Sequence, residues 1–262
     1  MKHEWELPAT VSDYWRRRRI WDRWSVESLE TNTRSEHVGQ RQLTVEAVRL
    51  LTQRNLRVID LCCGTGRVSA DLLPLQTVKE VVVLDISPRA LGVLAEKLAG
   101  HCDLAKLIIM HADFMHEIAP DLGEFDVIIC LDALHHLSNL PDALERIAKL
   151  LAPGGFFIGN FLPYESLARH VSAKKGRSRF LFGNLQAEAI RRLSFVDSLW
   201  RLSGRHGLVR FLPLSATQVM SNIEANFDLI EAHTSDYLWF MAAHKFTTTP
   251  TSARDATVGH RG

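Results

Sequence analysis

The chain has 262 residues, of which 46% are hydrophobic and 23% charged, a composition typical of a globular protein and unlike that of a disordered, collagen-like or coiled-coil chain. Its 31 basic residues nearly balance its 30 acidic residues, and this net charge of +1 argues against a dedicated nucleic-acid-binding protein. No apolar run approaches the roughly 20 residues of a membrane span, and the N-terminus lacks the apolar stretch of a signal peptide. The four cysteines are too few for a disulfide scaffold and none pair with zinc-site spacing, so we expect a metal-free, cytoplasmic protein.

Residues 1–53 are mostly helical in tendency and hold four of the six tryptophans. On a helix, Tyr14 and Trp21 share a face with an arginine of the run 16–19, and Trp15 lies nearer the end of that run. This segment either covers a bound ligand as a lid or packs its tryptophan side on the domain and leaves its arginines in solvent. The sequence leaves both interpretations open.

Between residues 54 and 162 the sequence alternates short apolar runs with helical patterns. The apolar runs predict strands at 56–61, 80–86, 106–110, 125–131 and 155–161. The helical patterns cover 67–73, 88–98 and 140–151, with a start signal at Ser87-Pro88 and a stop signal at Pro153-Gly154-Gly155. Alternation of strand and helix with nearly continuous apolar strands predicts a parallel sheet covered by helices on both faces.

The remaining third of the chain contains three different kinds of segment. Residues 163–213 interrupt the last crossover with a mainly helical insertion, and residues 163–215 carry ten basic against three acidic residues. After an N-cap at Ser215, a helix over 216–227 leads into an antiparallel strand pair, 227–234 and 237–246. The polar tail 247–262 has no periodicity and is expected to be disordered. We therefore expect one domain, 1–246, whose core is formed by 54–162 and 214–246.

The most informative stretch runs from Val58 to Gly66, VIDLCCGTG, where a strand ends in a carboxylate and enters a glycine turn that opens a helix. Glycines let the backbone approach a ligand closely, and the helix N-terminus presents N–H groups. The second strand ends at Asp85, 25 residues after Asp60, and an acid at this place can accept both hydroxyls of a ribose. The turn does not suit NAD, because Ser69 occupies the position of the third glycine of G-x-G-x-x-G.

These residues resemble those of the class I S-adenosylmethionine (SAM)-dependent methyltransferases, particularly the small-molecule and quinone-biosynthesis group. The resemblance covers roughly 54–162 and 214–246. It rests on DLCCGTG, LDISPRAL, HADFM and FDVIICLDALHHL, followed by LLAPGGFF. One departure from the family pattern stands out, Cys62, which replaces the first glycine. It implies a Rossmann-like, doubly wound, seven-stranded sheet, mostly parallel with an antiparallel C-terminal strand pair, together with helical lid segments. It also implies SAM as the cofactor.

The resemblance further implies which residues bind SAM. They are Asp60, Cys62, Gly64 and Gly66 in the turn, Asp85 and Ile86 after the second strand, Asp113 and Phe114 after the third, and Leu131 after the fourth. The turn would hold the methionine end, the second-strand pair the ribose and the adenine face, and the third-strand pair the adenine edge. The carbonyl of Leu131 would accept from the methionyl ammonium.

Catalytic candidates follow from the same comparison. His135 and His136 come after the fourth strand, close to the expected methyl group, and either could be a general base. The alternative is that one packs and the other caps the loop. Tyr14 is a third candidate, since similar methyltransferases close an N-terminal helix over SAM with an aromatic residue, and an aromatic ring can stabilise a sulfonium.

For the acceptor, the basic segment lies where this family builds its acceptor pocket, so we expect a small, anionic metabolite or natural-product intermediate. The candidate substrate contacts are Trp15, Trp21, Asn139, Tyr164, Arg169, Arg177, Arg179, Ser203 and Arg205. The same segment could instead receive an acidic carrier protein or RNA, or be a solvated surface. The sequence lacks Asn/Asp-Pro-Pro-Tyr and Pro-Cys after the fourth strand, which disfavours adenine-N6, amide and cytosine-C5 methylation.

Two other function classes remain open at this stage. A SAM-consuming enzyme could cyclise its own cofactor to azetidine-2-carboxylate and release methylthioadenosine, with Asn139, Tyr164 or Ser203 orienting the carboxylate. A non-catalytic SAM-binding module could regulate a partner. Methyl transfer to a small molecule is the leading interpretation.

Overall fold

The computed structural model describes residues 21–22, 35–100, 103–117, 122–137, 139–166, 212 and 214–245. The expectations for the N-terminal lid, the 163–213 insertion and the tail therefore lie largely outside the described residues. None of the described helices is both long and apolar enough to span a membrane.

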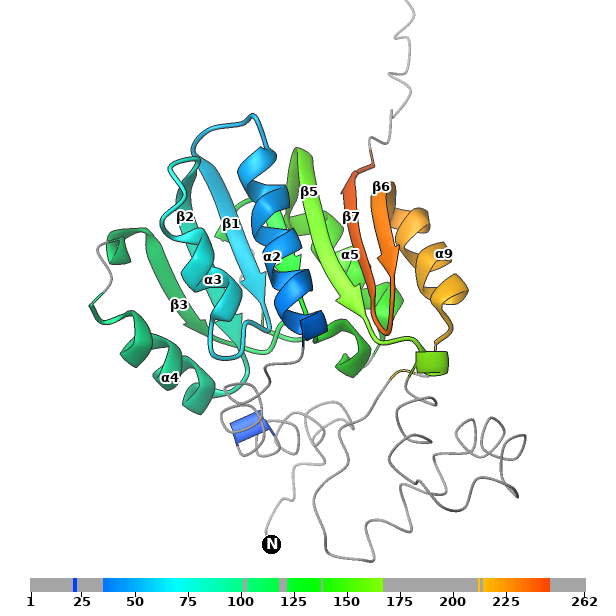
Figure 1. Ribbon diagram of the computed structural model, residues 1–262, viewed down its shortest axis with the longest axis horizontal. Coiled ribbons are helices and arrows are strands. Elements are labelled where there is room, and N and C mark those ends of the chain that lie inside the picture. The colour runs from blue at the N-terminus through cyan, green and yellow to red at the C-terminus, as the bar shows by residue number, and fades with distance from the viewer. Residues whose placement is uncertain are drawn as a thin grey trace, which may run out of the picture.

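Seven strands form a single sheet (Figure 1). They are β1 (Leu56–Leu61), β2 (Val78–Asp85), β3 (Leu107–His111), β4 (Phe125–Cys130), β5 (Leu151–Phe161), β6 (Phe227–Thr234) and β7 (Leu238–His244). Their order across the sheet is β3-β2-β1-β4-β5-β7-β6. The pairs among β1 to β5 are parallel, whereas β7 runs antiparallel to both β5 and β6. The predicted sheet, including its antiparallel C-terminal pair, is confirmed.

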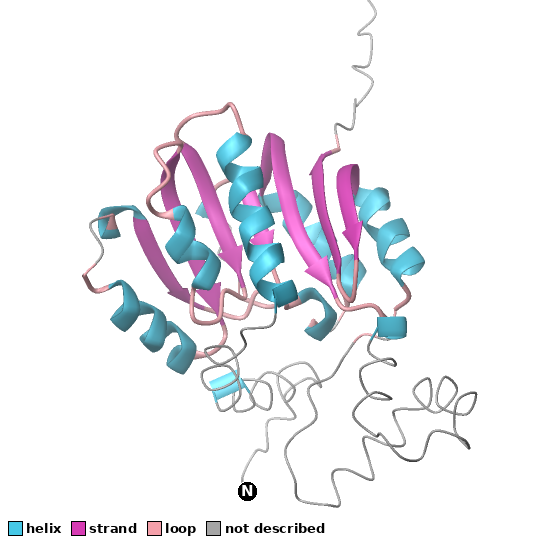
Figure 2. Ribbon diagram, in the orientation of Figure 1, coloured by secondary structure: helices cyan, strands magenta, loops and turns pink. Residues whose placement is uncertain are grey.

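Helices cover both faces of the sheet (Figure 2). They are α2 (Ser35–Leu50), α3 (Arg67–Leu72), α4 (Pro88–Leu98), α5 (Leu140–Leu150) and α9 (Ala216–Asn226), with the short helices η1 (Leu104–Lys106) and η3 (Leu134–His136). Side chains of α2, α3 and α4 form one buried apolar layer with one face of the strands, and side chains of α5 and α9 form a second layer with the other. Neighbouring residues of β1 point to opposite faces of the sheet, since Val58 belongs to the first layer and Ile59 to the second.

The sequence-based boundaries are correct for most elements and wrong at one. The predicted stop signal Pro153-Gly154-Gly155 does not end α5, which finishes at Leu150, but lies inside β5. Two steps along β4, from Phe125 to Val127, correspond to five along β5, from Leu151 to Phe156. The Pro-Gly-Gly segment is therefore a bulge, and Gly154, at φ 77°, supplies a left-handed conformation there.

Candidate functional site

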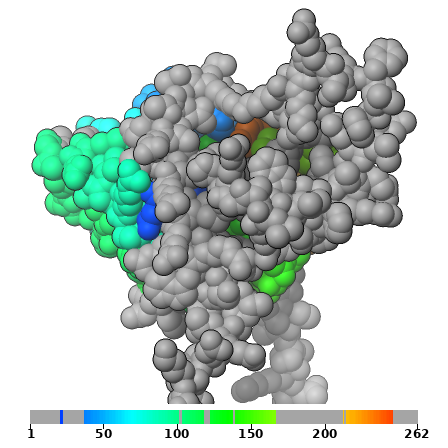
Figure 3. All heavy atoms as spheres, turned by 90° about the horizontal axis from the view of Figure 1, so that it is seen from below, coloured from blue at the N-terminus to red at the C-terminus, as the bar shows by residue number. Residues whose placement is uncertain are grey.

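A pocket of about 160 Å³ lies at the carboxyl edge of the sheet, where the loops after β1, β2, β3 and β4 meet the start of α2. Ligand sites of open α/β sheets form at this edge, where neighbouring connections leave on opposite faces. Figure 3 views the molecule from this side, with α4 at its flank.

The first wall of the pocket is the turn between β1 and α3. Cys62 and Gly64 both have φ 56°, and Gly66 has φ 69°. Three left-handed residues in five explain why the sequence is glycine-rich here. Cys62 adopts the same conformation with a side chain, at a cost of about 1–2 kcal/mol. Cys62 therefore occupies a backbone conformation that glycine would adopt without this cost.

Asp85, the last residue of β2, connects this turn to the next one. Its two carboxylate oxygens accept from the backbone N–H of Gly64 and of Ser87, each at 2.8 Å. The residue is only 7% exposed, and burial raises its pKa although both hydrogen bonds lower it. Asp85 therefore connects the turn after β1 to the loop after β2, and it is also a candidate ligand contact.

Asp60 is the second buried acid of the pocket. Ser69 Oγ donates to its Oδ2 at 2.6 Å. Burial raises the pKa of Asp60 to about 7, and the negative charge of Asp85 adds to that shift. A cationic ligand group would stabilise both carboxylates in their ionised form. Close by in the lining, the buried hydroxyl of Thr65 has no hydrogen-bond partner within the described part of the chain.

Most of the residues expected to bind the cofactor meet in this one pocket. Those that line it are Asp60, Cys62, Gly64, Asp85, Ile86, Asp113, Phe114 and Leu131. Gly66 does not line it and packs on α4 instead, where a Cβ would lie 2.2 Å from Leu94 Cδ1.

Of the two adjacent histidines predicted as catalytic candidates, only one lines the pocket. His136 lines the pocket, and its ring centroid lies 4.9 Å from that of Trp21, which also lines it. His135 lies outside the lining and is 2% exposed, and its Nδ1 accepts from the backbone N–H of Leu162 at 3.4 Å. Burial, followed by the charges of His136 and His37, lowers the pKa of His135 well below its usual value. His135 is thus a neutral, buried side chain that braces the loop after β5.

The other predicted substrate contacts are not in the pocket lining. Asn139 is exposed at the N-cap of α5, and Tyr164 donates its backbone N–H to the carbonyl of Leu214. The remaining substrate candidates lie outside the described residues: Trp15, Arg169, Arg177, Arg179, Ser203 and Arg205. The catalytic candidate Tyr14 lies outside them as well.

The short described segment 21–22 is tied to the start of α4. Ser87 Oγ donates to Asp22 Oδ1 at 2.7 Å, and Arg89 Nη1 donates to the backbone carbonyl of Asp22 at 2.8 Å. These bonds place Trp21 at the pocket, beside the loop that follows β2.

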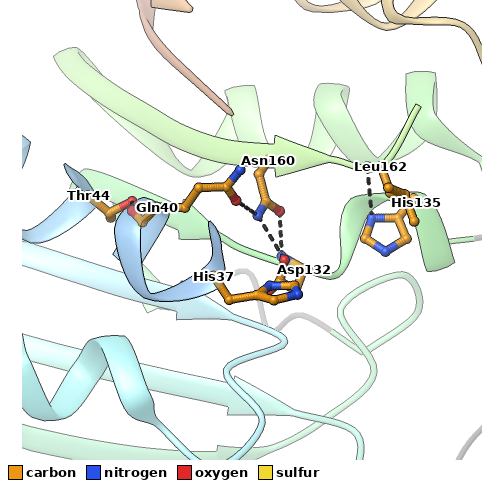
Figure 4. A network of polar contacts seen from close by, with 7 residues as sticks. All are labelled: His37, Gln40, Thr44, Asp132, His135, Asn160 and Leu162. Carbon is orange, nitrogen blue, oxygen red and sulfur yellow. Dashed lines mark hydrogen bonds and ion pairs between the residues drawn. The ribbon is translucent and has the colours of Figure 1, made fainter. Parts of the chain in front are cut away.

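Sequence reasoning missed a polar network around Asp132 and His37, two residues that line the pocket (Figure 4). Asp132 bonds to His37 of α2 and to Asn160 near the end of β5, and Asn160 in turn bonds to Gln40. No local motif marks these residues, because they come from three separate parts of the chain: α2, the loop after β4, and β5. Within the described ranges, no group of three or more His, Cys, Asp or Glu side chains could hold a metal ion.

Comparison with known proteins gives a consistent result. Residues 59–157 match a family model described as a methyltransferase domain. An uncharacterised methyltransferase of Synechocystis is 31% identical over 155 residues, which cover 57% of this chain and 66% of that protein. A demethylmenaquinone methyltransferase of Leptospira interrogans is 31% identical over 104 residues, which cover 40% of this chain and 42% of that protein.

The chain therefore spans less than two thirds of the length of these curated relatives. Among solved structures, the N-methyltransferase NodS from Bradyrhizobium japonicum, in complex with S-adenosyl-L-homocysteine, superposes with a TM-score of 0.55. It is 16% identical, and the match covers 88% of this chain and 97% of that one.

Proposed function

We propose, from the match of residues 59–157 to a methyltransferase domain, that the chain is a class I, SAM-dependent methyltransferase that transfers a methyl group from SAM to a small, anionic metabolite. One observation carries the proposal. A left-handed turn and two buried carboxylates, Asp60 and Asp85, meet in a pocket at the carboxyl edge of the sheet.

The pocket suits SAM in its chemistry. SAM carries a sulfonium and an ammonium. Burial raises the pKa values of the two acids, and cations of this kind would lower them and stabilise the carboxylates. Asp85 would accept from the ribose hydroxyls through lone pairs that its two backbone bonds leave on each oxygen. Asp60 and the turn would hold the methionine end, and the buried hydroxyl of Thr65 lies in the same lining.

The adenine and the ammonium would be bound by the neighbouring loops. Ile86 would cover the adenine face, while Asp113 and the backbone of Phe114 would meet its edge. Asp113 is held for this by the backbone N–H of Met115, which donates to its Oδ1 at 2.8 Å. The carbonyl of Leu131 would accept from the ammonium.

When bound, SAM supplies an electrophilic methyl group on a positively charged sulfur. The protein aligns the acceptor with that carbon and keeps water out. Trp21 and His136, in ring contact at the pocket, would cover the side on which the acceptor enters. The basic residues of 163–215 favour a carboxylate or phosphate on the acceptor.

The product of SAM turnover tests this function. Full-length protein incubated with SAM and an extract of small metabolites is expected to release S-adenosylhomocysteine, and SAM alone is expected to stay intact. Chromatography with mass detection distinguishes this product from methylthioadenosine. Methylthioadenosine formed from SAM alone would contradict methyl transfer and support cyclisation, which the family match does not favour.

The affinity for SAM is expected to rise with pH. The pKa of Asp60 is about 7 without ligand, and a bound cation lowers it, so the ionised form binds more tightly. Between pH 8 and pH 6 we expect the affinity to fall by about tenfold, with proton release on binding near pH 6.5. Titration calorimetry in buffers of different ionisation enthalpy measures both effects.

The control for this pH dependence is Asp60→Asn, which can still accept from Ser69 Oγ. This variant should bind SAM weakly with a flat pH profile. Its fold should also be more stable than wild type at pH 8 without ligand, because the ionisation of Asp60 destabilises the folded state as the pH rises from 3.8 to about 7. An unchanged pH profile in Asp60→Asn would assign the dependence to another group.

A further inference from the structure

We propose that His37 is the general base of the transfer, that Asp132 positions it, and that the group methylated is therefore a hydroxyl. This inference rests on the proposed methyltransferase function and names its acceptor class. It is carried by the network at the start of α2, which the sequence did not reveal (Figure 4).

The loop after β4 is fixed by one buried amide. Asn160 is 1% exposed, and its Oδ1 accepts from the backbone N–H of Asp132 at 2.5 Å. Its Nδ2 donates to Asp132 Oδ1 at 2.8 Å and to Gln40 Oε1 at 2.5 Å. Asp132 is thereby held at φ 57°, in the left-handed region that Asp adopts more readily than most residues with a side chain. These hydrogen bonds fix the backbone and one carboxylate oxygen of a residue that lines the pocket.

The second oxygen of that carboxylate contacts His37. Asp132 Oδ2 lies 2.9 Å from His37 Nδ1, and the two side chains are 33% and 11% exposed. An ionised carboxylate only accepts, so Nδ1 carries the proton and the lone pair of the neutral ring is on Nε2. The same carboxylate stabilises the imidazolium that forms when Nε2 takes a proton, which is the arrangement of an oriented base.

His37 and Asp132 both line the pocket that holds Asp60 and Asp85. The other titratable groups around His37 are Tyr237, whose ring centroid lies 5.1 Å away, and the pair His135 and His136. Arg41, one turn along α2, pairs with Asp71 at 3.1 Å. Asp132 is thus an anion in direct contact with His37.

The chemistry of this base selects the acceptor. In the transfer, the acceptor oxygen forms a bond to the methyl carbon as the carbon–sulfur bond breaks, and that electron pair stays on sulfur. The hydroxyl proton passes to His37 Nε2 and then to solvent. A neutral amine would attack without such a base, whereas a hydroxyl gains about 10²- to 10⁴-fold from one.

The test uses the full chain with two hydroxyl probes and one amine. Catechol keeps its proton at neutral pH, 4-nitrocatechol loses one near neutral pH, and benzylamine tests the other acceptor class. His37→Asn keeps an amide N–H for Asp132 but removes the ring base. We expect its kcat with catechol to fall at least 100-fold, with KM and SAM affinity within about twofold, and its kcat with 4-nitrocatechol at pH 8 to fall less than about fivefold.

Asp132→Asn tests the positioning role. Its side-chain oxygen must accept from Asn160, so its NH₂ group faces His37 and moves the ring proton to Nε2. We expect a similar loss of kcat with catechol and a change of tautomer in the ¹⁵N spectrum of His37, assigned with His37→Asn. His233→Asn, at an exposed histidine paired with Glu231 on β6, is the matched control and should match wild type.

Each other outcome overturns the inference. Equal losses on both hydroxyl probes, or no loss in His37→Asn, would make His37 structural. Transfer to benzylamine but not to the hydroxyl probes would overturn the acceptor class, as would SAM binding without methylation of either hydroxyl probe. Failure to bind SAM in calorimetry would instead overturn the proposed function itself.

Discussion

Replacement of Asp85 by alanine is expected to weaken SAM binding by two to three orders of magnitude, about 3–4 kcal/mol. The variant loses the proposed acceptor for the ribose hydroxyls. It also leaves the backbone N–H groups of Gly64 and Ser87 without their carboxylate, in a site where Asp85 is 7% exposed. Calorimetric titration with SAM measures the loss.

Two controls separate the binding effect from unfolding. Asp228→Ala removes an exposed carboxylate from β6 and should leave SAM affinity unchanged. Asp85→Asn keeps one oxygen for a backbone N–H and should retain more thermal stability than Asp85→Ala while still binding SAM poorly. If Asp85→Ala bound SAM like the wild type, the assignment of this pocket to SAM would be wrong.

Gly66→Ala is expected to destabilise the fold by about 3 kcal/mol and lower the Tm by roughly 10 °C. Two costs combine at this position. The residue has φ 69°, which costs a side chain about 1–2 kcal/mol, and the new Cβ would lie 2.2 Å from Cδ1 and 2.6 Å from Cγ of Leu94. Leu94 is fully buried, so it can move only by disturbing the α4 layer. Thermal and denaturant unfolding measure the change.

The steric part of this cost can be isolated. In the double variant Gly66→Ala/Leu94→Ala the loss should be smaller than the sum of the single losses by about 1–3 kcal/mol, because the contact is removed while the left-handed strain stays. Gly92→Ala, in α4, meets no atom within 4 Å and should stabilise by about 0.5–1 kcal/mol. Additive losses in the double variant would contradict a clash with Leu94.

The sheet could be predicted because its central strands are buried on both faces and so read as continuous apolar runs, such as VVVL before Asp85. Local cues also fixed α9, whose N-cap Ser215 forms a reciprocal pair with Gln218. The start of β5 was predicted at residue 155 instead of Leu151, because Pro-Gly-Gly usually interrupts regular structure and the bulge in β5 is visible only once β4 pairs with it.

The candidate site also has one part that local motifs revealed and another that only the tertiary structure revealed. The turn residues and Asp85 lie within motifs of a few residues, so the sequence brought them to attention. His37, Asp132 and Asn160 are far apart along the chain, 95 residues separating the first two, and they meet only through the tertiary fold. The adjacent pair His135-His136 drew interest as bases because of its position, but burial removes His135 from the pocket.

The anchoring of α2 has a consequence for the order of events during synthesis. Trp239 Nε1, in β7, donates to Thr44 Oγ1 at 3.0 Å, and Thr44 donates to the backbone carbonyl of Gln40, one turn from His37. The hydrogen bond between Trp239 and Thr44 spans 195 residues, so it cannot form until β7 has left the ribosome. By then β1 and β2, which flank the glycine turn and α3, have long emerged. We expect a nascent chain arrested before β7 to pair β1 with β2 while α2 remains undocked. Protease cleavage within 35–50 on stalled ribosomes, lost once residue 244 is exposed, would record that last step.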